Sequence, residues 1–328
     1  MGCSNKPNYE TSWEKYISQL EQVLNQKSKK DSLKMLSQPK LRPEQLSDTR
    51  VGVTEISILR KCGLFSLATK RNSLLGKQMM HSQRFLYEWQ IITLLINCRG
   101  KIPSSSAQLN EIIDSKKQDL MKSVYNLLFL SREAKELRIV SETTSTETIQ
   151  SFNIYKDEIL YLREILLSAL NYESPSITKI KIFEENLKIW AATHIHGILK
   201  YRVRLANLYL KRAIELQELA IESDAICPNK NIISSSNNYR LLVNSFYKTQ
   251  IHTELVDLMK KLNEIEVLWR PLVDKIQNTP HNEYELIALV INDNPEYIIQ
   301  LKARIRKNTQ LIQRIFDYCN LGSLTPIV

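Results

Sequence analysis

Six polar side chains in the first third of the chain form the sharpest candidate site in the sequence. Within a helix expected from Met80 onward, three of them share one face, because residues three and four positions apart are neighbours on a helix. Guanidinium, amide, phenol and carboxylate groups in this pattern could bind an anionic or sugar ligand. They could also hold a local turn in place as a buried polar network, which is the more common role. The candidate polar site consists of Arg71, Asn72, Gln83, Arg84, Tyr87 and Glu88.

A basic stretch later in the chain is a candidate surface for anions. Between Glu185 and Glu215 there are six basic residues and no acidic one. Helical spacing puts Lys200, Arg204 and Lys211 on one face, which could lie along the phosphates of lipid, lipopolysaccharide or nucleic acid. The alternative is an ordinary solvated face. A second basic run reinforces the first and consists of Lys302, Arg304, Arg306, Lys307 and Arg314.

Motifs for metal or enzyme chemistry are absent in any usable form. His194 and His196 would point about 200° apart on a helix, so the two rings do not readily hold one ion. His194 falls in an apolar stripe and is expected to be a core histidine. There is no G-x-S-x-G, H-E-x-x-H, P-loop or G-x-G-x-x-G pattern. We expect no metal and no cofactor, and a catalytic site built from scattered residues is left open.

The elements that must position these residues are helices. Apolar residues step by three or four from Phe85 to Ile96, and the same period continues from Ile180 to Leu208. The second pattern predicts one very long helix over 177–223, and Pro271 should break or kink a later one. We therefore expect an all-α fold, an irregular multi-helix bundle with one very long central helix. Expected helices cover 13–24, 80–98, 107–115, 119–137, 154–170, 177–223, 239–269, 283–291 and 295–318.

Composition agrees with this fold class. The 328 residues include seven glycines and ten prolines, and 43% are hydrophobic, which fits a helical protein with few loops. No run of about 18 apolar residues occurs, so no transmembrane helix is expected. The net charge of +10 favours anionic partners in general, without choosing among lipid headgroups, cell-wall polymers and nucleic acid.

Several segments carry a resemblance to a known family. These are RVGVTEISILRKCGL, KRNSLLGK and SQRFLYEWQ between residues 50 and 90, followed by Cys98, and later KKQDLMKSVYNLLF, AICP, FYKTQ and YCNLGSLTP. With them the chain resembles the domain of unknown function 3080 family, gammaproteobacterial envelope lipoproteins of unknown function, over nearly its whole length. The resemblance implies an envelope compartment, lipid attachment and disulfides. It carries over no catalytic residue.

The amino terminus bears on attachment to a membrane. Gly2, Cys3 and Ser4 match the end of a bacterial lipobox and the residue after it, while the charged and apolar regions that precede a lipobox are missing. The sequence would then be a mature form with a start methionine, or a gene start assigned too far downstream. Myristoylation at Gly2 is a poor alternative, because Lys6 and Pro7 stand where a Ser or Thr is wanted. An ordinary cytosolic start with an incidental cysteine is the remaining reading.

The other four cysteines suit an oxidising compartment if Cys3 is lipidated. Sequence order favours Cys62 with Cys98 and Cys227 with Cys319 among the three pairings. Four free thiols buried in a cytosolic core remain an alternative. Zinc is less favoured than either, because no C-x-x-C spacing occurs.

Together these features predict a lipid-anchored, periplasm-facing helical protein at the outer membrane, acting as a binding or scaffolding module. We expect a tether over 1–12 and a single all-α domain over 13–328, with a possible subdivision at the Ser- and Thr-rich stretch 141–151. The membrane and an anionic envelope component are the expected partners, and protein partners cannot be named. Rival hypotheses are an envelope enzyme using Arg71, Arg84, Tyr87 and Glu88, and an intracellular nucleic-acid binder using the basic helix, the less favoured of the two.

Overall fold

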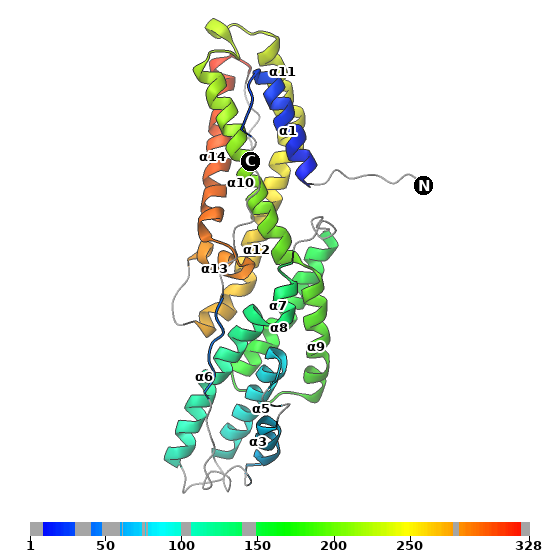
Figure 1. Ribbon diagram of the computed structural model, residues 1–328, viewed down its shortest axis with the longest axis vertical. Helices are drawn as coiled ribbons and strands as arrows, with labels where there is room; N and C mark the ends of the chain where they lie inside the picture. Colours follow the sequence, from blue (N-terminus) through cyan, green and yellow to red (C-terminus); the bar gives the residue numbers. More distant parts are fainter. Residues whose placement is uncertain are drawn as a thin grey trace, which may run out of the picture.

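The apolar periodicity of the sequence produces helices throughout the described part of the chain. The computed structural model describes residues 9–29, 41–47, 60, 62–73, 76, 78–99, 106–139, 149–277 and 282–322. Every regular element in these ranges is a helix, and most of them run along the length of an elongated body (Figure 1). The expected all-α multi-helix fold is confirmed.

The lower half of the body is built around two long neighbouring helices, α5 and α6 (Figure 1). Helices α8 and α9 contact each other, α7 contacts both α6 and α9, and α8 also contacts α6. Helix α7 is a single short turn capped by Ser131, whose hydroxyl accepts a hydrogen bond from the amide of Ala134. The bounds are α3 Phe65–Asn72, α5 His81–Arg99, α6 Ser106–Leu130, α7 Arg132–Glu136, α8 Ile149–Leu170 and α9 Ile177–Ala192.

The upper half groups α10 with α1, α14 and the α11–α12 run (Figure 1). Helices α11 and α12 are joined by the π-helical segment η3 without a non-helical residue between them. Pro271 lies inside α12, and the helix continues to Ile276, so the proline does not end it. The bounds are α1 Tyr9–Leu24, α10 Ile195–Glu222, η2 Pro228–Lys230, α11 Ser234–Leu242, η3 Val243–His252, α12 Thr253–Ile276, α13 Glu283–Ile291 and α14 Pro295–Tyr318.

The predicted long central helix is present but bent. Helices α9 and α10 meet at Thr193 and His194, and His194 has a left-handed backbone with φ of 52°. The bend is tied to the end of α7, because the amide of Gly197 donates to the carbonyl of Leu137 at 3.1 Å. A Cβ at Gly197 would lie 2.5 Å from the carbonyl oxygen of Ile139, so only glycine allows this approach. Helical periodicity continues across this point, which is why the sequence did not reveal the bend.

One connected cluster of buried apolar side chains runs through both halves of the body. The four tryptophans of the sequence, Trp13, Trp89, Trp190 and Trp269, are all fully buried within it. Large aromatic side chains contribute most to such a core because each buries a large area. Residues 140–148 lie outside the described residues, so the subdivision suggested near 141–151 stays a prediction.

Candidate functional site

The described contacts join some of the six residues of the candidate polar site, namely Arg84 with Tyr87 and Glu88. Asn72 and Gln83 are exposed on different elements. Arg71 serves its own turn, where its Nη1 donates to the carbonyl of Gly76 at 2.8 Å. Gln83, Arg84, Tyr87 and Glu88 all lie on α5, and the guanidinium of Arg84 lies 5.4 Å from the centre of the Tyr87 ring. The predicted shared face of Arg84, Tyr87 and Glu88 is therefore present on α5, and the described partner of Arg71 lies within its own turn.

Glu88 is instead the centre of a buried ion-pair network. Its side chain is fully buried, with Arg84 Nη2 at 2.6 Å from one carboxylate oxygen and Lys116 Nζ at 3.3 Å from the other. Lys116 also contacts Asp119 at 2.8 Å. Burial raises the pKa of Glu88, although the attraction of Lys116 and Arg84 opposes this. The network joins α5 to α6 and is enclosed by protein, as expected for a structural role.

Asp119 extends the network to a distant segment of the chain. Its Oδ1 accepts a hydrogen bond from the backbone amide of Ser47 at 2.7 Å. Nearby, the Asn126 side chain accepts from the amide of Glu44 and donates to the carbonyl of Glu44, both at 2.9 Å. Sequence reasoning missed these contacts. The i,i+3 spacing of Lys116 and Asp119 was a usable signal, but nothing in the sequence indicates a partner about 70 residues away.

The candidate anion-binding face is divided by burial. Lys200 and Arg204 are each only 7% exposed. Lys200 Nζ donates to the carbonyl of Asn292 at 2.7 Å, and Arg204 binds both oxygens of Asp293 at 3.0 and 2.5 Å. These two cations hold the turn between α13 and α14, so they are not available to an anionic ligand. Lys211 is exposed and lies 3.8 Å from Glu215.

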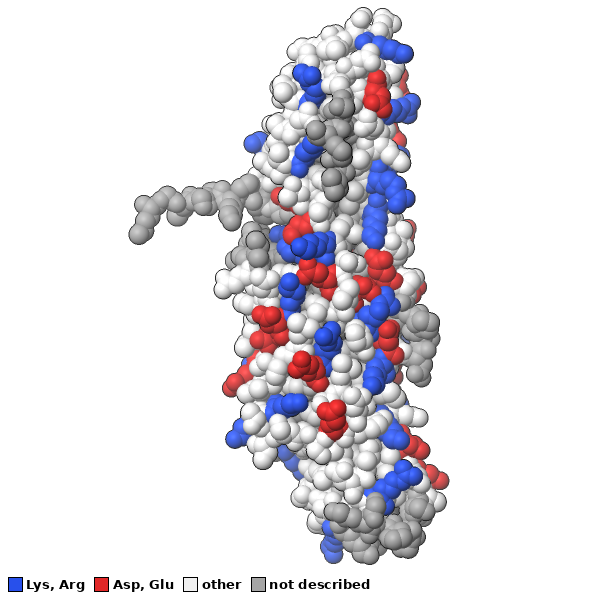
Figure 2. All heavy atoms as spheres, turned by 180° about the vertical axis from the view of Figure 1, so that it is seen from behind, with Lys and Arg blue, Asp and Glu red and all other residues white. Residues whose placement is uncertain are grey.

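The second basic run is largely paired as well. Arg304 Nη1 donates to the carbonyl of Asn207 at 2.8 Å, and Lys302 Nζ donates to Glu283 at 2.9 Å. Lys307 lies 2.7 Å from Glu218. Figure 2 shows cations and carboxylates intermixed over the visible face, rather than a single basic patch. On this face the positive charges are therefore interspersed with negative ones.

His194, the predicted core histidine, is only partly buried, and His196 is the histidine in the core. His194 is not the core histidine of a continuous stripe, since it occupies the bend between α9 and α10. Its Nδ1 lies 2.9 Å from the carbonyl of Glu136. His196 is the buried one, 1% exposed, and its Nε2 lies 2.9 Å from the hydroxyl of Tyr155.

Both predicted disulfides are present. Cys62 and Cys98 are joined with their Cα atoms 5.4 Å apart, and Cys227 and Cys319 with theirs 5.7 Å apart. The first links the start of the α3 region to the end of α5. The second links the segment after α10 to the end of α14. The pairing that sequence order favoured is the one in the fold, and the alternative of four free thiols is wrong.

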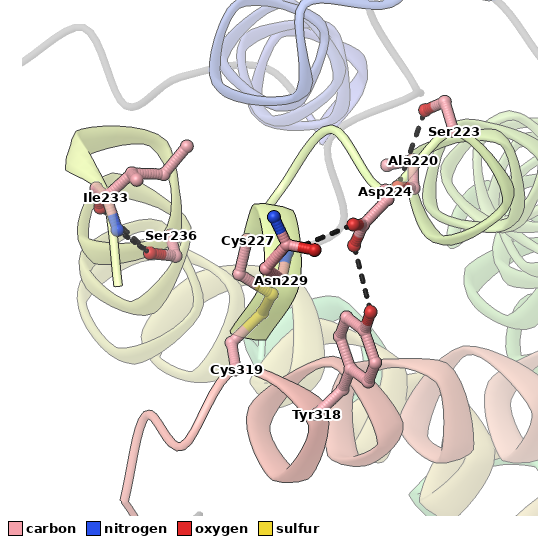
Figure 3. Close-up of a disulfide and its surroundings, with 9 residues drawn as sticks. All are labelled: Ala220, Ser223, Asp224, Cys227, Asn229, Ile233, Ser236, Tyr318 and Cys319. Carbon is pink, nitrogen blue, oxygen red and sulfur yellow. Dashed lines mark hydrogen bonds between the residues drawn. A yellow bond between two sulfur atoms is a disulfide. The ribbon is translucent and has the colours of Figure 1, made fainter. Parts of the chain in front are cut away.

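The Cys227–Cys319 disulfide lies in a well-bonded corner of the molecule (Figure 3). Both cysteines are fully buried. The carboxylate of Asp224 accepts from the amide of Asn229 at 3.1 Å and from the hydroxyl of Tyr318 at 2.9 Å, so it bridges the same two segments as the sulfurs. These contacts hold the end of α14 against the segment that follows α10.

Three further predictions concern the amino terminus, metal binding and membrane-spanning helices. Cys3 and the proposed tether before Tyr9 lie outside the described residues. Within the described ranges, no three His, Cys, Asp or Glu side chains are grouped as metal ligands. Among the helices described, none is both long and apolar enough to span a bilayer.

Comparison with known proteins gives one match. A family model described as "Protein of unknown function (DUF3080)" matches residues 13–323, nearly the whole chain. No curated protein and no solved structure matches the sequence or the fold. The match therefore carries no activity and no ligand with it.

Proposed function

This chain belongs to the DUF3080 family of proteins of unknown function, and we propose that it is a lipid-anchored helical module of the Gram-negative envelope that faces the periplasm and binds or scaffolds other envelope components. The proposal joins an anchor at Cys3 to a disulfide-closed body. Ser4 after the lipidated cysteine directs it to the outer membrane under the usual bacterial sorting preference.

The observation that carries the proposal is the pairing of four cysteines. Disulfides form and persist in oxidising compartments such as the periplasm and are rare in the cytosol of mesophiles. Both pairs close segments that lie far apart in sequence, by 36 and 92 residues. Cys227 and Cys319 belong to the buried core, and Cys62 packs against it. Four of the five cysteines are thus used, which leaves Cys3 as the single one that can carry a lipid.

The shape and the surface charges favour a binding role that does not depend on one strongly charged patch. An elongated helical body offers a long surface to other components (Figure 1). The net charge of +10 gives a weak, salt-sensitive attraction to anionic headgroups or cell-wall polymers. Lys200 and Arg204 are buried, so the basic helix offers little to nucleic acid. Glu88 is enclosed, which counts against an enzyme centred on the candidate polar site.

Intact mass of the protein isolated from its native host under non-reducing conditions tests the anchor and the redox state together. We expect a chain that begins at an acylated Cys3 and lacks four hydrogens because two disulfides are closed. A Cys3→Ser variant with the native upstream sequence should lose the acyl mass and leave the membrane fraction, while keeping both disulfides. A native chain that begins at unmodified Met1 with five free thiols would contradict the proposal.

The binding role has its own measurement. Crosslinking in intact cells should join the wild-type chain to discrete envelope components, and the Cys3→Ser variant, with the same folded body, serves as the matched control. Loss of those products in the variant fits a module that works at the membrane. A wild-type chain that gives only monomer at all crosslinker lengths would remove the scaffolding part of the proposal.

A further inference from the structure

Arg138 carries a buried positive charge that forms no ion pair with a carboxylate among the residues that the structure describes. The residue follows α7 and is only 7% exposed. Its Nη1 donates to the carbonyl of Phe129 at 2.6 Å, whereas Nε and Nη2 have no hydrogen-bond partner. Burial lowers the pKa of Arg138 to about 10, so the guanidinium is still charged at neutral pH. A buried guanidinium in this state is costly unless its donors are satisfied.

His196 presents a second buried donor. Trp269 Nε1 donates to the Tyr155 hydroxyl at 2.6 Å, and that hydroxyl lies 2.9 Å from His196 Nε2. Because the hydroxyl accepts from Trp269 and has one proton of its own, we assign it as the donor to Nε2. The neutral ring then carries its hydrogen on Nδ1, which has no partner. Burial, and then the nearby charge of Arg138, lower the pKa of His196, which keeps the ring neutral.

Trp190 is a third buried side chain with an unpaired donor. Its side chain is fully buried and its Nε1 has no hydrogen-bond partner. The Trp190 and His196 rings lie 6.1 Å apart, and the His196 and Trp269 rings 5.6 Å apart. The Arg138 side chain lies beside the same rings, since its Nη1 donates to the carbonyl of Phe129, the Phe129 and Trp269 rings lie 5.7 Å apart, and the charge of Arg138 acts on His196. The unsatisfied groups therefore occupy one aromatic cluster where α9, α10 and the end of α7 meet.

The chemistry of this cluster is one-sided. Arg138 Nε and Nη2, His196 Nδ1 and Trp190 Nε1 are all donors, and one of the three side chains is positively charged. Each buried donor left unpaired costs about 1–3 kcal/mol, so several together in one cluster need an acceptor. A single water is a poor solution, because it accepts from two donors and adds two hydrogens that need acceptors themselves. An anion accepts from every side and compensates the guanidinium.

We propose that the Arg138–His196–Trp190 cluster is an internal site for a small anion, either a halide or one oxygen-bearing group such as a carboxylate or phosphate. The bound anion neutralises Arg138 and ties the end of α7 to the bend between α9 and α10. It thereby stabilises the junction of the two halves of the body. This site is independent of the lipid anchor and of the compartment.

Thermal unfolding with added anions tests the site, using the full chain with its disulfides intact. Chloride, acetate and phosphate are compared at constant ionic strength against a bulky organic anion. A ligand that binds only the native state raises the Tm with concentration, here by a few degrees over about a hundredfold range. The anion that gives the larger rise identifies the class of ligand. Arg138→Gln should abolish the rise, and Arg132→Gln, an exposed arginine of the same α7, should keep it.

A structural measurement on the unmodified protein decides the matter even if Arg138→Gln does not fold. Crystals grown with bromide should show an anomalous peak within hydrogen-bonding distance of the Arg138 guanidinium and His196 Nδ1. An ordered water there that bromide does not replace, together with equal Tm shifts in wild type and both variants, would overturn the proposal.

Discussion

Arg204 and Asp293 form a buried ion pair at the scale of single residues, and the pair explains why this arginine is not part of a ligand surface. The side chains are 6% and 0% exposed and are joined by two hydrogen bonds. The bond to Asp293 raises the pKa of Arg204. Asp293 also accepts from the amide of Asn294, so the same carboxylate orders the start of α14.

Replacing Arg204 with methionine should strongly destabilise the fold. Asp293 would be left buried without its cation, which costs about 3–5 kcal/mol in the free energy of unfolding. Lys211→Met is the matched control, since Lys211 belongs to the same predicted face but is exposed and should change stability by less than about 1 kcal/mol. Urea unfolding measures both. Equal small losses in the two variants would show that Arg204 is in contact with solvent.

Glu254 makes stability depend on pH near neutrality. Burial raises the pKa of its carboxyl to about 7, while Arg202 opposes the rise and Asp257 adds to it. The folded protein then binds this proton more tightly than the unfolded chain, where a glutamate titrates near about 4.3. The contribution of protonated Glu254 to the free energy of unfolding is therefore fully present below about pH 4.5, and it is lost as the pH rises from there through 7. The wild type should lose stability across this window relative to Glu254→Gln.

Unfolding by urea at about pH 5 and about pH 7.5 checks this difference. The exposed Glu222, at the end of α10, gives the control Glu222→Gln, which should follow the wild type at both values. A Glu254→Gln variant with the same pH dependence as wild type would place the titration elsewhere.

The bend between α9 and α10 is the decisive feature at the scale of elements. His194, the residue before α10, has a left-handed backbone and places its Nδ1 against the carbonyl of Glu136, so the bend and the end of α7 are fixed together. The backbone amide of Gly197 donates to the carbonyl of Leu137. This bond satisfies one of the first backbone amides of α10, which have no acceptor within the helix.

Substitutions at His194 should separate the backbone effect from the side-chain effect. Glycine and valine both remove the contact with Glu136, but glycine adopts a positive φ freely and a β-branched residue does not. We expect His194→Val to be less stable than His194→Gly by at least about 1–2 kcal/mol. The difference in urea midpoint between the two variants is the measurement. Equal stabilities would mean that the helix straightens when the side chain is removed.

At the scale of the whole molecule, two disulfides close the chain at opposite ends of the body. The Cys227–Cys319 pair spans 92 residues and the Cys62–Cys98 pair 36. In the chain-entropy picture, a longer closed loop restricts the unfolded ensemble more, giving about 5 kcal/mol for the first and about 4 kcal/mol for the second. Either value is comparable to the net stability of a domain.

Removing the pairs should therefore lower stability in that order. The double variants Cys227→Ala/Cys319→Ala and Cys62→Ala/Cys98→Ala are compared by urea unfolding without reductant, and the first should lose more. Reductant should destabilise the wild type and have no effect on a variant that lacks all four cysteines. A wild type whose unfolding is unchanged by full reduction would show that the bonds do not restrict the unfolded chain.

The sequence by itself determined the helical class, the apolar faces of the helices and the order of the cysteine pairs. These follow from local periodicity and from the chain order of Cys62, Cys98, Cys227 and Cys319, which the fold keeps. It also indicated that Arg84 and Glu88 share one face of a helix, and the structure joins them there as an i,i+4 ion pair.

Only the tertiary structure decided which charges are buried and where the long helix bends. Lys200 and Arg204 meet the turn at Asn292 and Asp293 across about 90 residues, and Asp119 meets Ser47 across 72. The bend at His194 depends on the end of α7, which is 58 residues away at Glu136. Periodicity describes which face of a helix is apolar, but it does not say which distant backbone or carboxylate a cation on that helix will meet. For this reason two of the three cations on a basic face that looked open in the sequence, Lys200 and Arg204, are buried, and only Lys211 is exposed.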